Sequence, residues 1–323
     1  MVLRHWSLVI GALLACLAGM PARAAAQDTH VLVIVGVGGD EEHTTRFNTW
    51  AGQVVDAAKK RGVADANILY LGERTELDTT RMKGRATRDA VIKAFGDLAT
   101  RAKANDEVFV LLIGHGSFDG RTAAFNLPGP DLTADDYKPL LDKLRLQKVA
   151  FINTASSSGA FLEPLAGPGR TIVTATKTGG ERNEPRFAEY FIEALSSDVA
   201  DRDRNGRVSV QEAFDYARQR VTAAYEKDGN LLSEHAALND GAEGKLAAMQ
   251  FLAPQRSRST EMANADPKLR GLVEERDALE RQIAELRLRK DSLEPARYDE
   301  QLEKLLTDLA LKTRQIRDAE AKK

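Results

Sequence analysis

Short, almost entirely apolar runs alternate with longer amphipathic stretches from residue 30 to residue 251. Continuous apolar runs are typical of strands buried on both faces of a sheet, and this chain has five: His30–Val37, Asn67–Glu73, Glu107–His115, Lys148–Ala155 and Arg170–Lys177. Helical spacing of apolar residues predicts helices over Arg46–Arg61, Thr87–Lys103, Thr133–Leu144 and Pro185–Ser196. This alternation predicts an α/β domain over residues 28–254, a three-layer sandwich with a mostly parallel sheet.

A different pattern follows the polar residues 255–266, which we interpret as a linker. From residue 267 to residue 321, apolar residues recur in steps of three and four, which predicts a coiled-coil helical tail; they are Leu269, Leu272, Leu279, Ile283, Leu286, Leu293, Leu302, Leu305, Leu309 and Ile316. Pro295 divides this stripe. Because proline is tolerated in a first helical turn but not inside a helix, a helical hairpin is favoured over one long rod.

The tail has two interpretations. An isolated amphipathic helix cannot bury its own apolar stripe, so we expect the tail to self-associate or to bind a partner helix. The alternative is a solvated helix that caps the domain.

The N-terminus has the features of a signal peptide over residues 1–26: a short basic start, an apolar stretch and small residues before the cleavage site. It predicts export, to the periplasm or outside the cell. The alternative is a lipoprotein anchored at Cys16, because the residues that end there resemble a lipobox. Cys16 is the only cysteine, so the exported chain has no disulfides. We expect no transmembrane segment in it.

Charge excludes one class of partner. The formal net charge is −2 and the sequence pI is about 6.3. Proteins that bind nucleic acid normally have a basic face or a basic domain. We therefore expect no nucleic acid to bind.

Two neighbouring predicted strands end in residues that can carry chemistry. The first ends in His115-Gly116, and an imidazole titrates near neutral pH, which suits it to proton transfer. The next is followed by Ser156, within Ala155–Gly159, where a hydroxyl and main-chain N–H groups can lie beside the histidine. Open α/β sheets bind ligands at the carboxyl ends of their strands. We expect His115 and Ser156 to face one another at that edge.

These two motifs, in this order on consecutive strands, resemble those of the caspase and legumain superfamily of cysteine peptidases, most closely the bacterial relatives of the legumain-type (C13) enzymes. The resemblance covers roughly residues 31–251. It implies a caspase-like fold with His115 as the catalytic histidine and Ser156 in the position of the nucleophilic cysteine. It also implies a supporting asparagine after the first strand, where this chain has Gly36-Val37-Gly38-Gly39. We expect this support to be missing.

The serine decides what we expect of the site. A thiol is partly ionised at neutral pH, whereas a hydroxyl needs a general base held close to it. We therefore expect a catalytically silent binding or scaffold module that takes a peptide or protein ligand. A peptidase or esterase remains open, with Ser156 as nucleophile, His115 as base and the N–H groups of Gly116 and Ser156 as oxyanion donors. An unrelated use of the fold also remains open.

A second motif, residues 201–212, matches an EF-hand calcium loop at its diagnostic positions. Gly206 takes the sixth position, where the loop turns sharply. The expected ligands, at positions 1, 3, 5, 7, 9 and 12, are Asp201, Asp203, Asn205, the carbonyl of Arg207, Ser209 and Glu212. We predict a bound Ca²⁺ with a structural role. The alternative is a turn rich in Asp, Asn and Gly that holds no metal.

Overall fold

The structure is a computed structural model that describes residues 27–203, 205–241, 244–253, 267–288 and 293–320. The predicted signal peptide, with Cys16, and the predicted linker lie outside these residues.

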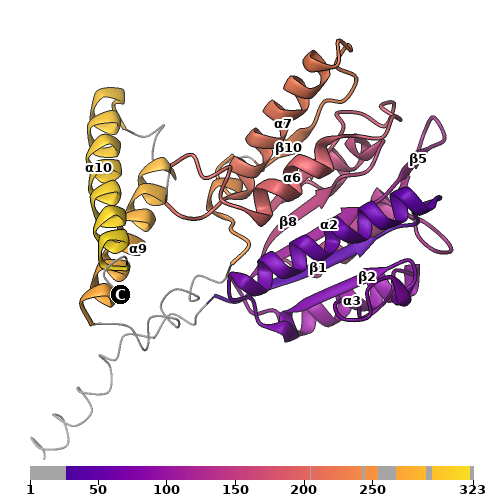
Figure 1. The fold of residues 1–323 in the computed structure, drawn as a ribbon, viewed down its shortest axis with the longest axis horizontal. Coiled ribbons are helices and arrows are strands. Elements are labelled where there is room, and N and C mark those ends of the chain that lie inside the picture. Colours follow the sequence, from indigo (N-terminus) through magenta and orange to yellow (C-terminus); the bar gives the residue numbers. More distant parts are fainter. Residues whose placement is uncertain (1–26, 204, 242–243, 254–266, 289–292, 321–323) are drawn as a thin grey trace, which may run out of the picture.

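A seven-stranded sheet of order β10-β9-β8-β4-β1-β2-β3 forms the centre of the molecule (Figure 1). The five predicted strands are all present and pair in parallel; they are β1 (Thr29–Val35), β2 (Ile68–Gly72), β4 (Glu107–Ile113), β8 (Lys148–Asn153) and β9 (Arg170–Thr174). Every residue of β1 and of β4 is buried, which explains their continuous apolar sequences.

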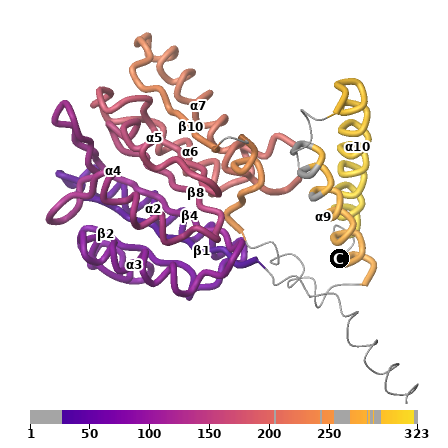
Figure 2. The backbone as a smooth tube through the Cα atoms, turned by 180° about the vertical axis from the view of Figure 1, so that it is seen from behind, coloured from indigo at the N-terminus to yellow at the C-terminus, as the bar shows by residue number. Residues whose placement is uncertain are grey.

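Helices cover both faces of the sheet, as predicted (Figures 1 and 2). One face packs against α2 (Glu41–Lys60), α6 (Phe187–Ser196) and α7 (Val210–Lys227). The other packs against α3 (Arg88–Arg101), α4 (Ala134–Leu141) and α5 (Leu162–Leu165). Alternate residues of β1 divide between the two clusters, because successive side chains of a strand point to opposite faces. The three-layer α/β sandwich is confirmed.

One helix boundary was predicted wrongly. Helix α2 begins at Glu41 instead of Arg46, because the side chain of Asp40 caps it by accepting a hydrogen bond from the His43 N–H. Helix α3 begins at Arg88, capped by the Thr87 side chain, which accepts a hydrogen bond from the Ala90 N–H.

Several short elements were not predicted. A small antiparallel sheet of β5 (Gly116–Phe118), β6 (Ala123–Phe125) and β7 (Leu132–Thr133) follows β4 directly. The main sheet gains β3 (Gly84–Arg85) and an antiparallel edge strand, β10 (Ala237–Asn239). Short 3₁₀ turns complete the domain: Asp65–Asn67, Thr75–Leu77, Ser158–Phe161 and Ala247–Met249. Elements of two to four residues are too short to show a period.

The C-terminal tail forms a helical hairpin of α9 (Pro267–Leu288) and α10 (Pro295–Glu320), which stands to one side of the α/β domain (Figures 1 and 2). Leu269 and Val273, early in α9, pack against Ile316, late in α10, so the two helices are antiparallel. The hairpin was correctly favoured over a rod. In the described part of the chain, no helix is both long and apolar enough to cross a membrane.

Candidate functional site

Ser156 lies where the sequence places it, at the carboxyl end of β8 and against the residue that follows His115. Strands β4 and β8 are parallel neighbours, with Leu112 opposite Asn153, so the segments that follow them meet at one edge. The Ser156 side chain is buried. Its Oγ donates a hydrogen bond to the Gly116 carbonyl oxygen at 2.9 Å and accepts one from the Gly116 N–H at 3.3 Å.

The glycines of both motifs are required by close approach of the backbone. A Cβ on Gly116 would lie 2.1 Å from the main-chain oxygen of Ser156. A Cβ on Gly159 would lie 2.2 Å from the carbonyl carbon of Lys177. Neither position has room for a side chain. The two glycines therefore allow the turn after β8 to approach the backbone of Gly116 on one side and of Lys177 on the other.

The other two serines of the run fix the turn. Ser158 is fully buried, and its Oγ accepts hydrogen bonds from the N–H groups of Ala175 and Thr176, at 3.0 and 3.2 Å. Ser157 has a left-handed backbone, with φ at 58°, and its N–H donates to the Glu181 carbonyl at 2.8 Å. These contacts fasten the segment after β8 to the segment after β9, which leaves Ser156 as the member of the run that contacts Gly116.

His115 is oriented by a main-chain carbonyl. Its Nε2 lies 3.1 Å from the Gly38 oxygen, and since a carbonyl only accepts, Nε2 carries the proton. The ring also packs edge-on against Phe47, with 5.1 Å between ring centroids. The turn has no asparagine side chain at the place where the resemblance implied one, and the main-chain carbonyl of Gly38 contacts the ring there.

A second histidine, His43, was missed by sequence reasoning. It lies beside His115, with 4.9 Å between ring centroids. Its Nδ1 bonds the Asp40 carboxylate at 2.7 Å and its Nε2 bonds Glu184 at 2.8 Å. The hydrogen bond with Asp40, followed by that with Glu184, raises the pKa of His43. The helix start gives no sequence signal for this, since Glu184 is 141 positions away.

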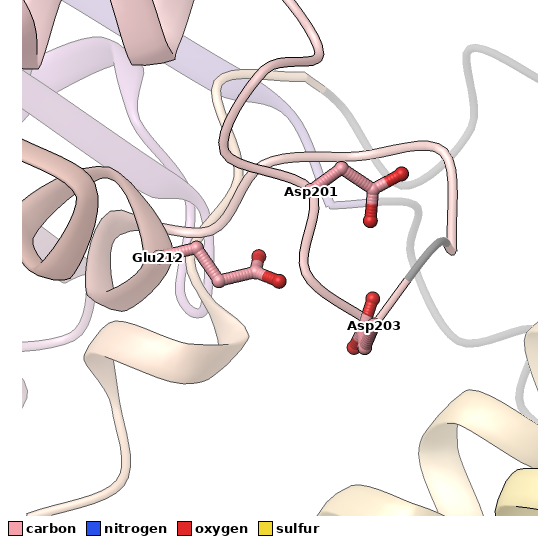
Figure 3. Close-up of side chains that lie close together, drawn as sticks. All are labelled: Asp201, Asp203 and Glu212. Atoms are coloured by element: carbon pink, nitrogen blue, oxygen red, sulfur yellow. The ribbon is translucent and has the colours of Figure 1, made fainter.

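The predicted calcium loop brings three carboxylates together (Figure 3). One oxygen from each of Asp201, Asp203 and Glu212 lies within 4.8 Å of the others. Burial, and then the neighbouring charge of Glu212, raise the pKa of Asp203 to about 6. Gly206 has φ at +80°, as the sharp turn at the sixth position requires. This convergence is what oxygen coordination of a hard cation needs.

The remaining predicted ligands lie on the same loop. The Asn205 side chain donates to the Asp203 carboxylate at 3.1 Å. Ser209 caps α7 in a capping box with Glu212, its Oγ accepting from the Glu212 N–H at 3.2 Å. The Arg207 side chain points away from the loop, to Glu280 of the tail. The entering helix α6 ends at Ser196, as predicted, and a short turn separates it from the loop.

Comparison with known proteins decides the family. The Peptidase C13 family matches residues 22–240, more than half of the chain. The chain belongs to the peptidase C13 family. Membership confirms the caspase- and legumain-like assignment made from the His-Gly and serine motifs.

Two further comparisons add nothing to this C13 assignment. A crystal structure of the protein GSU0716 from Geobacter sulfurreducens is similar at 14% identity and a TM-score of 0.42, over 66% of this chain and 92% of that one. No curated protein matches the chain.

In this C13 chain, the two candidate catalytic side chains share an edge of the sheet, but their hydrogen bonds go elsewhere. Among the described residues, the Ser156 hydroxyl bonds main-chain atoms of Gly116, and the His115 ring bonds Gly38. Neither is hydrogen-bonded to the other. A serine nucleophile needs a base in contact with its proton, and among the described residues the proton of the Ser156 hydroxyl is directed at the Gly116 carbonyl.

Proposed function

We propose that this C13-family protein is catalytically silent and binds a peptide or protein at the edge of its sheet. One observation carries the proposal: the Ser156 hydroxyl, which by its motif stands in the place of the family's nucleophilic cysteine, donates its proton to the Gly116 carbonyl and not to His115.

The chemistry of the two nucleophiles supports this. A free thiol, with a pKa of about 8.5, is a few per cent ionised at neutral pH and attacks without full base assistance. A hydroxyl must lose its proton to a base during attack. With Nε2 of His115 donating to Gly38, the base would have to be Nδ1, and the Ser156 proton is directed at a carbonyl instead.

Restoring the thiol tests the proposal. In a Cys16→Ser background, Ser156→Cys carries the only thiol of the chain. We expect iodoacetamide to react faster with this cysteine at neutral pH than with a control cysteine at the exposed Ser117, and His115→Ala to remove the difference. The chain with Ser156 should cleave neither peptides nor esters.

The opposite result would support the hydrolase alternative. A fluorophosphonate probe that labels the natural chain, and no longer labels it after Ser156→Ala or His115→Ala, would show an activated serine and end the case for a silent site.

We also propose that the 201–212 loop binds Ca²⁺. Three converging carboxylates repel one another unless a cation lies between them. Asp201, Asp203, Asn205 and Glu212 would supply side-chain oxygens, Arg207 its carbonyl and Ser209 its hydroxyl, and the ion would link the loop to the start of α7.

Calorimetric titration of the full chain with Ca²⁺ tests this second proposal. Glu212→Gln should abolish binding. Asp215→Asn, which removes a carboxylate outside the cluster on the same helix, should not. Equal binding by the natural chain and the Glu212→Gln variant, or no binding at millimolar Ca²⁺, would contradict it.

Export and self-association complete the proposal. The sequence of residues 1–26 supports export by a cleaved signal peptide, which predicts a mature N-terminus at Ala25 or Gln27. A lipid on Cys16 would contradict this cleavage.

The apolar residues Leu302 and Leu305 of the tail are half-exposed on α10, which supports pairing of the tail with a second copy of the chain. Light scattering of the full chain should give a mass above that of the monomer, and Leu302→Asp should lower it.

A further inference from the structure

Arg207 connects the proposed calcium loop to the helical tail. Its side chain leaves the loop and forms an ion pair with Glu280 of α9. The two side chains are only 23% and 12% exposed, so the pair is largely shielded from water. The guanidinium also lies 4.1 Å from the centre of the Phe251 ring, a cation–π contact.

On the tail side, the ion pair sits among other buried charges. Arg276 is 2% exposed, it bonds Asp277, and its Nε lies 3.6 Å from Glu280. A buried charge is costly unless it is paired. The face of α9 that carries Glu280 is therefore stabilised by Arg207.

On the domain side, the loop is fixed to the base of the sheet. Ser209 forms a β-bridge with Phe251, and the Val210 N–H donates to the Gln250 carbonyl at 3.0 Å. The Phe251 N–H lies 3.4 Å from the Glu107 carboxylate at the start of β4. The residue that reaches the tail thus comes from a loop whose exit is anchored to the central sheet.

We propose that calcium binding to this loop strengthens docking of the α9–α10 hairpin on the α/β domain, with Arg207 as the connecting residue. The proposal rests on the calcium site proposed above. The carbonyl of Arg207 is the expected ligand at the seventh position, so an ion that holds this carbonyl also fixes the base of the side chain that reaches Glu280. Because coupling between two sites is reciprocal, a docked tail should in turn tighten calcium binding.

Calcium affinity measured on the full chain tests the coupling from one side. Glu280→Gln should weaken calcium binding by about fivefold or more. The matched control, Glu274→Gln, removes the same charge from an exposed position of the same helix and should leave the affinity unchanged.

Tail position tests the coupling from the other side. In the Cys16→Ser background, spin labels on cysteines at Leu146, which is 69% exposed on the domain, and at Lys304, exposed on α10, report the distance between domain and hairpin. Calcium should narrow the distance distribution, and Glu280→Gln should remove that response. If Glu280→Gln does not fold, the effect of calcium on the distance distribution in the chain with Glu280 intact still tests the proposal.

The outcomes separate the two proposals. The coupling is overturned, and the calcium site stands, if calcium binds but leaves the distance distribution unchanged and Glu280→Gln leaves the calcium affinity unchanged. If the natural chain binds no calcium, both are overturned.

Discussion

Ser157 is a strained residue in the turn that positions Ser156, and Ser157→Gly should relieve the strain. The left-handed backbone of Ser157 costs a non-glycine residue about 1–2 kcal/mol. Its side chain is 1% exposed, and among the described residues its Oγ has no hydrogen-bond partner, which costs about 1–3 kcal/mol. Against this, glycine loses more freedom on folding, about 0.4–1 kcal/mol. The vacated space costs about 0.5–1.5 kcal/mol.

The balance favours glycine by about 2 kcal/mol, which should raise Tm by about 4–8 °C for a domain of this size. Thermal and urea unfolding of Ser157→Gly and Ser157→Ala measure it, because alanine removes the hydroxyl but keeps the left-handed strain. Glycine should be the more stable of the two variants. A glycine variant no more stable than the alanine variant would refute the claim that the backbone of Ser157 is strained.

Three other predictions concern pH, packing and metal. Burial raises the pKa of Glu107 to about 7, so the folded state holds a proton that the unfolded state releases above about pH 4.5. The free energy of unfolding should fall by about 2–3 kcal/mol between pH 5 and pH 8 in the natural chain, mostly below pH 7, but not in Glu107→Gln; equal pH dependence in the two would contradict this. Gly159→Ala puts a Cβ 2.2 Å from backbone and should cost about 1–3 kcal/mol in urea unfolding. Gly180→Ala, whose Cβ would have its nearest contact at 3.5 Å, should cost little stability. An equal loss of stability in the two variants would contradict the close approach of Gly159 to the Lys177 backbone. Calcium at a hundredfold excess over Kd should raise Tm by about 5–10 °C in scanning calorimetry, and a similar rise in Glu212→Gln would place the effect elsewhere.

The sheet could be predicted from the sequence because its central strands are buried on both faces. Burial on both faces gives runs such as that of β4 an unbroken apolar character. The start of α2 was misplaced because its first turn is polar, so the apolar period begins only at Phe47. The only sequence signal for the small sheet of β5 to β7 is Asp119-Gly120, a dipeptide typical of hairpin turns, between β5 and β6.

The candidate site was predictable in part, for a related reason. His115 and Ser156 could be placed because parallel neighbouring strands bring their carboxyl ends together. The support of His115 could not, since it is the main-chain oxygen of Gly38, which every residue type possesses. The contact of His43 with Glu184 depends on how α2 packs against the segment before α6. A local sequence pattern cannot predict such a long-range contact. The 201–212 loop differs, because twelve consecutive residues determine most of its own geometry.

The proposed exchange of a thiol for a hydroxyl at position 156 would have a structural effect as well as a chemical one. A hydroxyl is a stronger hydrogen-bond donor than a thiol. Ser156 both donates to and accepts from Gly116, so it ties the turn after β8 to the residue that follows His115. Attack by this oxygen on a substrate would first have to break the bond to the Gly116 carbonyl and then transfer the proton to Nδ1 of His115, the ring nitrogen that does not donate to Gly38. The hydrogen bond from the Ser156 hydroxyl to the Gly116 carbonyl therefore opposes attack by this serine, and this supports the proposal of a silent binding site.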